Sequence, residues 1–379
     1  MSKSILIFSV VKLEDMKQKG NISYIKHYEN YFDKVYMVYL TGRTQSFVDG
    51  KTSYISLGKE NTIMDLILAP TRLYKFCKNK DIDIFLTGDL IFSWWNSFLI
   101  KFFKKAKIFL IPVAMPHVIY QSSQKTMTGI LPYFIEKFFV YLSFSNAYRV
   151  VTGKNITQYV KWLSSHTVTK NKLLIVDILV EELPSIGFFD SLNNEVNIVK
   201  REKNILLYVG RLHKEKLVFD IIKAFEIVKK NISELELWLI GDGEEEKDIK
   251  AYCISNNFEN SVKFLGFKES SELVSFYKEA TLFVSPLTGT SLREAALCGL
   301  PIVCYKMDWV AENFKDKEQL LFVEKGNVND FSEKIEFLLE SPILYDKLQK
   351  NMLEYAYNSW NIKSIEKALN KIYEENLLC

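Results

Sequence analysis

Along most of the chain, short apolar runs alternate with longer segments in which apolar residues recur every three or four positions. Near-continuous apolar runs are typical of strands that are buried on both faces of a parallel sheet, whereas the longer periodicity indicates amphipathic helices. The alternation of the two patterns predicts an α/β protein built on parallel sheets.

The pattern in the first half predicts a complete sheet followed by a connection. Strands are expected at residues 4–11, 35–40, 82–87, 107–115, 148–153 and 173–178. The segment that follows mixes Pro, Gly, paired Asn and both signs of charge, which is typical of a connection. We therefore place the first domain at residues 1–180 and a linker at residues 181–204.

A second alternating series follows the linker. Strands are expected at 205–210, 235–243, 262–266, 281–286 and 301–305, with helices at 218–230, 244–253, 270–280, 291–299 and throughout 341–379. This predicts a second domain at 205–358 and a closing helix at 359–379. The expected fold class is two Rossmann-like, doubly wound domains facing a cleft, with ligands at the carboxyl ends of the strands.

Length and composition support this organisation. A chain of 379 residues exceeds the size at which one core usually stops growing. Five cysteines without a CxxC pair, and four scattered histidines, indicate free thiols in a reducing compartment and no metal site. No apolar run reaches the roughly 18–20 residues of a spanning helix, and no secretory signal opens the chain. We expect a cytoplasmic protein.

Charge is distributed unevenly between the halves. Residues 1–150 hold 20 Lys/Arg against 11 Asp/Glu, a balance of +9, and residues 151–379 hold 29 against 35, a balance of −6. A basic half predicts an anionic partner, either a phosphorylated acceptor or an acidic membrane surface. Nucleic acid is not expected, because no compact recognition motif accompanies the lysines.

An aromatic segment at 92–107 has two interpretations. One helical stripe is formed by Trp95, Phe98, Leu99, Phe102, Phe103 and Ala106, and Lys101, Lys104 and Lys105 lie outside it. Such a stripe more often packs on a sheet. The alternative is peripheral contact with the inner face of the plasma membrane through the first domain, and the aromatic segment 132–144 has the same character.

The stretch 286-PLTGTSLREAALCGLPIV-303 places a glycine turn and hydroxyls ahead of a helix. Gly289 and the hydroxyls of Thr288, Thr290 and Ser291 come directly before or at the expected helix start. A helix start offers unpaired N–H groups and the positive end of a dipole, so this turn suits an anion.

The turn 207-LYVGRLHKEK-216 carries a second candidate anion site. Arg211 follows the end of a strand, and Lys216 lies five residues further on. Arg presents a planar fork to phosphate oxygens and Lys a point charge. Taken alone, this pair also fits two ordinary surface cations. The glycine turn at Gly241 and Gly243 is typical of any nucleotide-binding fold.

In combination, these segments are similar to a known family. The order Gly-Arg-Leu-x-x-Glu-Lys, a strand ending Gly-Asp-Gly, Phe-Leu-Gly and then LREAALCGLPIV resembles the nucleotide-sugar domain of the GT-B retaining glycosyltransferases of family 4. The likeness is sharp over residues 205–330 and continues at 359–375, which resembles the family's closing helix after a tryptophan. In that fold the closing helix crosses back to the first domain. Over residues 1–200 the likeness is architectural.

The resemblance implies roles for individual residues. Arg211 and Lys216 match the pair that grips the donor diphosphate and steadies it as leaving group, and Glu294 matches a glutamate that accepts hydrogen bonds from the ribose hydroxyls. The implied donor site comprises Gly210, Arg211, Lys216, Gly241, Phe264, Leu265, Gly266, Thr288, Gly289, Thr290, Ser291, Leu292 and Glu294.

Two positions depart from the family's pattern. The motif's first glutamate would lie eight residues before Glu294, where this chain has Pro286. In the family that glutamate contacts the donor sugar. Lys216 is followed by Leu217, where the family usually has glycine.

The implied activity is metal-independent and needs no cofactor. It is transfer, with retention, of a hexosyl or N-acetylhexosaminyl group from a nucleotide sugar, UDP-sugar favoured over GDP-sugar. The acceptor would be a hydroxyl of a glycan or of a polyprenyl-diphosphate-linked glycan, in bacterial surface polysaccharide biosynthesis. The alternative is a non-catalytic GT-B partner of another glycosyltransferase: the missing glutamate favours it, and the retained cations and Glu294 oppose it.

The first domain is expected to bind the acceptor. His117 follows the apolar strand expected at 107–115, at its carboxyl end. Because its reference pKa lies near neutrality, it could orient or deprotonate an acceptor hydroxyl. A loop histidine without a catalytic role is the alternative.

Overall fold

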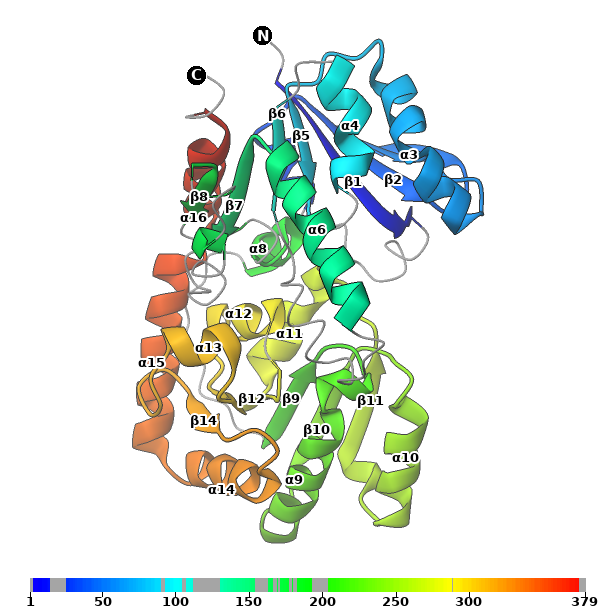
Figure 1. Ribbon diagram of the computed structural model, residues 1–379. Helices are drawn as coiled ribbons and strands as arrows, with labels where there is room; N and C mark the ends of the chain where they lie inside the picture. Colours follow the sequence, from blue (N-terminus) through cyan, green and yellow to red (C-terminus); the bar gives the residue numbers. More distant parts are fainter. Residues whose placement is uncertain are drawn as a thin grey trace. The chain divides into compact units, whose positions relative to one another are not determined.

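The computed structural model describes residues 3–13, 25–89, 93–103, 107–111, 130–153, 163–165, 169, 171–176, 179, 183–192, 204–287 and 289–374 (Figure 1). The chain forms two compact units. Residues 1–180 and 365–379 make up the first, and residues 181–364 the second.

The first unit contains an eight-stranded sheet in the order β3-β4-β2-β1-β5-β6-β7-β8. The strands are β1 Ser4–Lys12, β2 Lys34–Thr41, β3 Gln45–Asp49, β4 Thr52–Ser56, β5 Ile84–Thr87, β6 Lys107–Leu110, β7 Arg149–Gly153 and β8 Leu173–Val176. All neighbouring strands run parallel except β3 and β4, which form an edge hairpin. The sequence pattern predicts the six other strands and misses this hairpin, whose strands are rich in Ser, Thr and Gln.

Helices of the first unit include α2 Ile25–Glu29, α3 Thr62–Cys77, α4 Ser93–Phe103 and α6 Ile130–Asn146. Helix α4 contacts both α3 and α6, as Figure 1 also shows. Ala69 and Leu73 of α3 and Ile100 of α4 join Leu6 and Phe8 of β1 in one buried cluster, because the inward faces of these helices pack on the sheet.

The end of the chain completes the core of the first unit. The turn η5 spans Asn370–Glu374, and its Tyr373 is fully buried. The Tyr373 ring lies 5.3 Å from that of Phe32, 5.4 Å from Phe109 and 6.4 Å from Tyr28, measured between centroids. Beside it, Lys371 Nζ donates a hydrogen bond to the Ile175 carbonyl of β8 at 2.7 Å.

The aromatic stripe of residues 92–107 was expected to pack on a sheet, but the orientation of helix α4 differs from this expectation. Among the α4 side chains whose burial is described (residues 93–102), four are buried, namely Ser93, Asn96, Ser97 and Ile100. Phe98 and Phe102 are 46% and 73% exposed. The expectation that this stripe packs on a sheet is therefore wrong for these two phenylalanines. The polar inward face is accommodated by hydrogen bonds to α6, where Asn146 donates to Ser97 Oγ.

The second unit contains a six-stranded, all-parallel sheet in the order β11-β10-β9-β12-β13-β14. The strands are β9 Ile205–Val209, β10 Glu236–Ile240, β11 Val262–Gly266, β12 Leu282–Ser285, β13 Ile302–Tyr305 and β14 Leu321–Val323. Five of them are predicted by the apolar runs. The three-residue β14 is too short to stand out in the sequence.

The helices and helical turns of this unit are α8 Ile186–Leu192, η3 Lys214–Lys216, α9 Val218–Asn231, α10 Glu246–Ser255, η4 Glu259–Ser261, α11 Ser270–Glu279, α12 Thr290–Leu297, α13 Asp308–Asn313, α14 Val328–Leu339, α15 Pro342–Ser359 and the start of α16 Ile362–Leu369. Helix α8 lies in the stretch that we assigned to the linker, and it packs on α11. The tail is not one helix, because α15 ends before Trp360 and α16 begins after Asn361.

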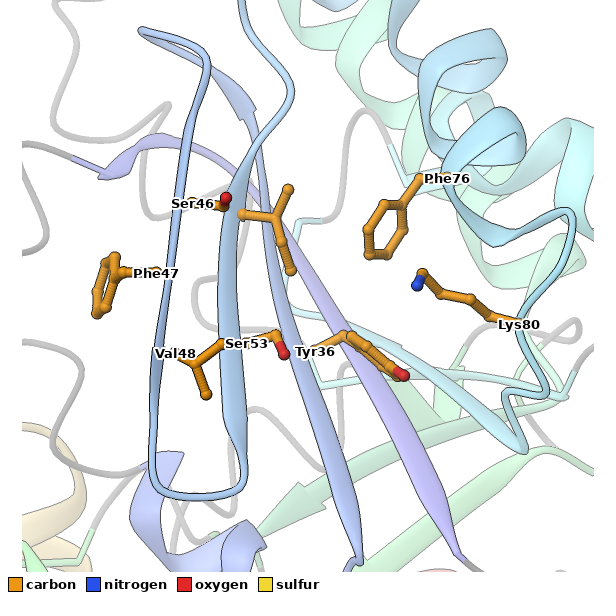
Figure 2. A pocket seen from close by; sticks show the side chains of 8 residues that line it. Tyr36, Ser46, Phe47, Val48, Ser53, Phe76 and Lys80 are labelled. Carbon is orange, nitrogen blue, oxygen red and sulfur yellow. The ribbon is translucent and has the colours of Figure 1, made fainter.

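A hollow of about 360 Å³ lies at the hairpin edge of the first unit (Figure 2). Tyr36, Phe76 and Lys80 line one part of it, and Lys80 Nζ lies 4.8 Å from the centre of the Phe76 ring. Tyr36 and Ser53 come early in β2 and β4, so the hollow is near the amino ends of these strands. Parallel α/β sheets bind ligands at the opposite ends.

Among the residues that the structure describes, no helix is long and apolar enough to cross a membrane.

Candidate functional site

The strand order of the second unit has a switch point at a defined place. From β9 the chain proceeds to β10 and β11 on one side, and β12 then returns to the other side of β9. The chain after β9 leads to β10 on one side, and the chain after β12 leads to β13 on the other, so the loops that follow these two neighbouring strands diverge. Open α/β sheets bind their ligands at such a switch point. Arg211 follows β9 and Gly289 follows β12, so the sheet brings both anion-binding candidates to the same edge.

The turn after β9 holds two cations close enough to influence each other. Lys216 is partly buried, and burial followed by the charge of Arg211 holds its pKa below the ordinary value for lysine. Arg211 is half exposed, and its Nη2 lies 3.3 Å from Glu215 Oε1. Two like charges that are partly removed from water favour an anionic ligand, because it relieves both their repulsion and their desolvation.

The backbone of the turn after β9 is held by a hydrogen bond from a buried tyrosine. The buried Tyr208 hydroxyl donates a hydrogen bond to the Arg211 carbonyl at 3.0 Å. Leu217, which links η3 to α9, has a φ of 56° and a ψ of 36°, in the left-handed region. Glycine adopts this conformation without strain, which explains physically why a glycine suits this position.

The glycines at the strand ends have a structural role. Gly210 N–H donates to the Ile240 carbonyl and Gly241 N–H to the Gly266 carbonyl, each at 2.9 Å, so these three predicted site residues meet. Gly241 has a φ of 128°, and a Cβ there would lie 2.1 Å from the Gly210 carbonyl oxygen. The close approach of β9 and β10 therefore requires glycine at 241, whatever it contributes to a ligand.

Two further predicted donor residues, Phe264 and Leu265, lie on β11 beside Gly266 and are partly buried. Lys250 Nζ lies 4.8 Å from the centre of the Phe264 ring. Both side chains retain some exposure near the carboxyl end of β11.

The turn after β12 is compact and leads into α12. Ser285 Oγ donates to the Leu287 carbonyl at 2.8 Å, and Pro286 is buried. Gly289 is the N-cap of α12, and Thr290 and Ser291 form its first turn, all partly exposed. Their N–H groups are thus available at a helix start. Leu292, by contrast, is fully buried. Thr288 and His117 lie outside the described residues.

Glu294 is a buried carboxyl with a specific partner. It is 5% exposed, and the Tyr277 hydroxyl of α11 donates to its Oε2 at 2.9 Å. The same hydroxyl lies 3.2 Å from the Ser291 carbonyl, its second acceptor. Burial raises the pKa of Glu294 from 4.5 to about 7, and the Tyr277 hydrogen bond opposes this rise. A carboxylate with one hydrogen bond keeps lone pairs for two ribose hydroxyls.

The raised pKa of Glu294 predicts a pH-dependent cost in stability. Between pH 4.5 and about 7 the folded protein retains a proton that the unfolded chain loses, so stability falls as pH rises through this window. Glu294→Gln avoids this ionisation and keeps an acceptor for Tyr277. We expect urea unfolding at pH 8 to show a variant more stable by about 3 kcal/mol, with the difference vanishing below pH 4.5.

Tyr277→Phe provides the complementary test. Its loss of the hydrogen bond should raise the pKa of Glu294 further, so this variant should lose more stability at pH 8 than at pH 4.5. Equal effects of either substitution at both pH values would contradict the assigned pairing.

Three structural partners of the site were missed by reasoning from the sequence. Tyr208 and Tyr277 lie in a strand and a helix of ordinary apolar pattern, and nothing local marks their hydroxyls. Arg293 adjoins Glu294, is 4% exposed, and places its guanidinium 4.4 Å from the Trp309 ring centre. A charged residue that directly follows a leucine and precedes Glu294 and an apolar run is the signal that could have identified it. The contacts of Glu294 with Tyr277 and of Arg293 with Trp309 attach α12 to α11 and α13.

The structure also gathers three possible metal ligands that their sequence positions do not suggest. The ligand atoms of His213, Glu215 and Glu244 all lie within 4.8 Å of one another. The two glutamates are exposed, and Glu215 is already paired with Arg211. An acidic grouping of this kind is common on protein surfaces, and we assign no metal to it.

Comparison with known proteins agrees with this geometry. Residues 191–359, which include both turns and Glu294, match the family model described as "Glycosyl transferases group 1". An uncharacterised glycosyltransferase of Haemophilus influenzae is 22% identical over 62% of this chain and 64% of its own length. An uncharacterised glycosyltransferase of Methanocaldococcus jannaschii is 27% identical over 80% of this chain and 76% of its own length.

Other relatives carry functional names. A poly(glycerol-phosphate) alpha-glucosyltransferase of Bacillus subtilis is 22% identical over 96% of this chain, which spans about half (55%) of that relative. Among solved structures, a sucrose-phosphate synthase of Thermosynechococcus elongatus aligns with a TM-score of 0.72 at 16% identity, over 99% of both chains. HepE of Anabaena, solved with UDP and glucose, aligns with a TM-score of 0.71 at 14% identity, over 98% of this chain and 100% of its own.

The structural likeness covers both Rossmann-like units, and the family match covers the unit that carries the cationic turn and Glu294. Residues 191–359 of this chain are thus similar to the glycosyl transferases group 1 family, and the chain has the two-domain GT-B fold.

Proposed function

We propose that this protein transfers a hexosyl or N-acetylhexosaminyl group, with retention of configuration, from a UDP-sugar to a hydroxyl of a glycan or polyprenyl-diphosphate-linked glycan. The observation that carries the proposal is the switch point of the sheet in the second unit. It places Arg211 and Lys216 on one side and the start of α12, with Glu294, on the other.

The donor's parts correspond to these groups. The diphosphate would lie between the two cations and the N–H groups of Thr290 and Ser291, where charge and helix dipole both favour it. The ribose hydroxyls would donate to the Glu294 carboxylate, which Tyr277 holds in place. The base would lie near Phe264 and Leu265, at the carboxyl end of β11.

Chemistry at this site is mainly stabilisation of the leaving group. As the bond between the sugar and the diphosphate breaks, negative charge grows on the phosphate oxygen, and Arg211 and Lys216 would stabilise it in place. This arrangement needs no metal to neutralise the diphosphate. Attack by the acceptor on the face that the nucleotide leaves would retain the configuration.

The names of relatives support the choice of donor and acceptor class. The relative from Bacillus subtilis is an alpha-glucosyltransferase acting on poly(glycerol-phosphate), and a Staphylococcus aureus relative is named for capsular polysaccharide biosynthesis. Two alpha-monoglucosyldiacylglycerol synthases are also similar, so lipid acceptors occur among the relatives. We assign the acceptor to the first unit, with His117 as the candidate group that orients its hydroxyl.

A second candidate function is a non-catalytic partner of another glycosyltransferase. Pro286 favours it, because a buried proline occupies the position of the family's sugar-contacting glutamate. The retained pair of cations and the buried Glu294 favour the enzyme.

A thermal-shift screen followed by product analysis decides between them. The protein is heated with UDP, GDP and their common sugar derivatives, and a ligand that binds the folded state raises Tm by mass action. We expect a shift with UDP and with one UDP-sugar. NMR of the transferred sugar, or of the hydrolysed sugar before it mutarotates, should show the donor's anomeric configuration. Absence of any shift would favour the non-catalytic partner, and an inverted product would refute retention.

A further inference from the structure

The hollow at the β3–β4 hairpin lies over a part of the sheet that keeps accessible side chains. Strand β4 buries every second residue, whereas Ser53 and Ile55, which lie between the buried ones, are partly exposed. Ser53 pairs with Tyr36 of β2 on one side and with Val48 of β3 on the other. Because paired residues point to the same face of a sheet, these side chains form a row across the floor of the hollow.

Two aromatic rings and one ammonium group form the wall of the hollow. The rings of Tyr36 and of Phe76 from α3 lie 5.9 Å apart between centroids and are inclined at 79°. Lys80 Nζ lies 5.3 Å from the centre of the Tyr36 ring and 4.8 Å from that of Phe76, and Figure 2 shows it between the two rings. The rings therefore form a corner, in which a flat aromatic ligand could stack on only one of them.

The Lys80 ammonium is held against the rings by a weak attraction. At a partly exposed site, a contact between an ammonium and an aromatic ring contributes less free energy than a hydrogen bond between two charged groups. The lysine stem is also flexible. An anionic group that enters the hollow can therefore draw the ammonium away from the rings and leave their faces open to the rest of the ligand.

The lining of the hollow identifies the chemistry of its occupant. The eight described residues that line it include one cation and no acid, and Ser46 and Ser53 contribute hydroxyls. Its volume of about 360 Å³ lies in the range of small-molecule sites. A sugar ring has a face of carbon-bound hydrogens, which packs on aromatic rings, and a rim of hydroxyls, which bond serines. The unopposed charge of the lining favours a sugar that is also anionic.

A partner helix fits this surface less well. A helix that docks in a groove needs a continuous apolar lining along its own length. Here Ser46, Ser53 and Lys80 interrupt the apolar lining, and the hollow is small. A compact ligand with both polar and apolar parts is the better match.

We propose that the hollow at the β3–β4 hairpin is a second ligand site, which binds one sugar residue that carries a carboxylate or a phosphate. The sugar ring packs in the corner of Tyr36 and Phe76, its hydroxyls bond the serines of the floor, and Lys80 pairs with the anionic group. The site belongs to the first unit and lies near the amino ends of β2 and β4, so it is distinct from the donor site of the second unit. Its occupation requires neither donor nor turnover, and the inference is independent of the proposed function.

The test is saturation-transfer NMR of the purified full-length protein with two pairs of probes, in the presence of excess UDP. Tetragalacturonic acid is compared with its methyl ester, and glucose 6-phosphate with glucose, because the members of each pair differ mainly in charge. The wild type should bind at least one anionic probe about tenfold more tightly than its neutral counterpart. Saturation should be strongest at carbon-bound protons of the sugar ring, and the pair that responds distinguishes a carboxylate from a phosphate.

Two substitutions separate the charge from the rings. Lys80→Met should weaken binding of the anionic probe about tenfold and leave the neutral probe unchanged. Phe76→Leu should weaken both members of a pair by about threefold to tenfold, because it removes an aromatic face. Leucine keeps an apolar side chain where Phe76 packs against the core of the first unit. If Phe76→Leu melts early, Lys80→Met decides alone, since the Lys80 side chain is partly exposed.

The matched control is a lysine and a ring outside the hollow. Lys317 Nζ lies 5.8 Å from the centre of the Phe337 ring in the second unit. Lys317→Met combined with Phe337→Leu should bind every probe like the wild type. Any shift in Tm that UDP causes in the wild type should be the same in all these variants, so failure of the donor site and failure of the hollow give different results.

Four results would overturn the proposal. These are a wild type that binds neither anionic probe, equal binding of the charged and neutral members of both pairs, and a control variant that loses as much binding as Lys80→Met. The fourth is a probe that binds the wild type, Lys80→Met and Phe76→Leu equally well, because such a probe occupies another part of the chain.

Discussion

Replacing Arg211 by alanine is expected to lower kcat for sugar transfer by about 100-fold or more, while the protein remains folded. Arg211 follows β9 at the switch point of the sheet, as Lys216 does, and its side chain is half exposed, so its removal leaves no cavity. What is lost is a preorganised charge at the departing diphosphate, and loss of one such donor typically costs about 3 kcal/mol of barrier. Initial rates of UDP release at saturating donor measure the effect.

Lys214→Ala is the matched control for this variant. Lys214 is an exposed cation of the same turn, one residue from Glu215, and has no proposed contact with the donor. It should retain kcat within about twofold, since substitutions at exposed sites usually have small effects. Near-normal turnover in Arg211→Ala, or equal losses in the two variants, would remove the basis of the donor site.

The second large effect is expected at the ribose. Glu294→Ala should weaken UDP binding by about 100-fold or more, because each of two hydrogen bonds to a charged acceptor contributes at least about 1.5 kcal/mol. Calorimetric titration gives the two dissociation constants. Circular dichroism and Tm establish that the variant is folded, which matters because Glu294 is buried beside Tyr277.

A change in the ligand isolates the contact. If Glu294 accepts hydrogen bonds from the ribose, the wild type should prefer UDP over its 2′,3′-dideoxy analogue by about 100-fold, and Glu294→Ala should bind both almost equally. The same preference in both proteins would show that Glu294 acts on the fold rather than on the ribose. This double cycle needs no knowledge of the sugar or the acceptor.

Patterns within one element predicted most of the fold. Six strands of the first sheet and five of the second follow from apolar runs, because buried parallel strands are apolar on both faces. The β3–β4 hairpin lies at an edge: β3 has no buried residue, and β4 alternates buried with partly buried residues over only five positions. Strand β14 has three residues, so neither the hairpin nor β14 gives a comparable signal.

Side-chain contacts between different helices and strands could not be predicted from the sequence. The donor candidates Arg211, Lys216 and Glu294 could be predicted, because each lies near a turn that the adjacent sequence marks. Their supports come from other elements: Tyr277 approaches Glu294 from α11, and nothing in its own sequence context reveals this. Helix α4 illustrates the same limit. Its aromatic stripe is regular, yet hydrogen bonds with α6 turn its polar side inward and leave Phe98 and Phe102 exposed.

The position of Tyr373 affects how this chain is made. Its ring completes an aromatic cluster with Phe32 and Phe109, residues that leave the ribosome more than 250 residues earlier. Residues 181–364 form a continuous unit that is synthesised before this last segment. The unit at residues 181–364 can therefore fold first, and the core of the first unit stays open until the segment that contains Tyr373 has been synthesised.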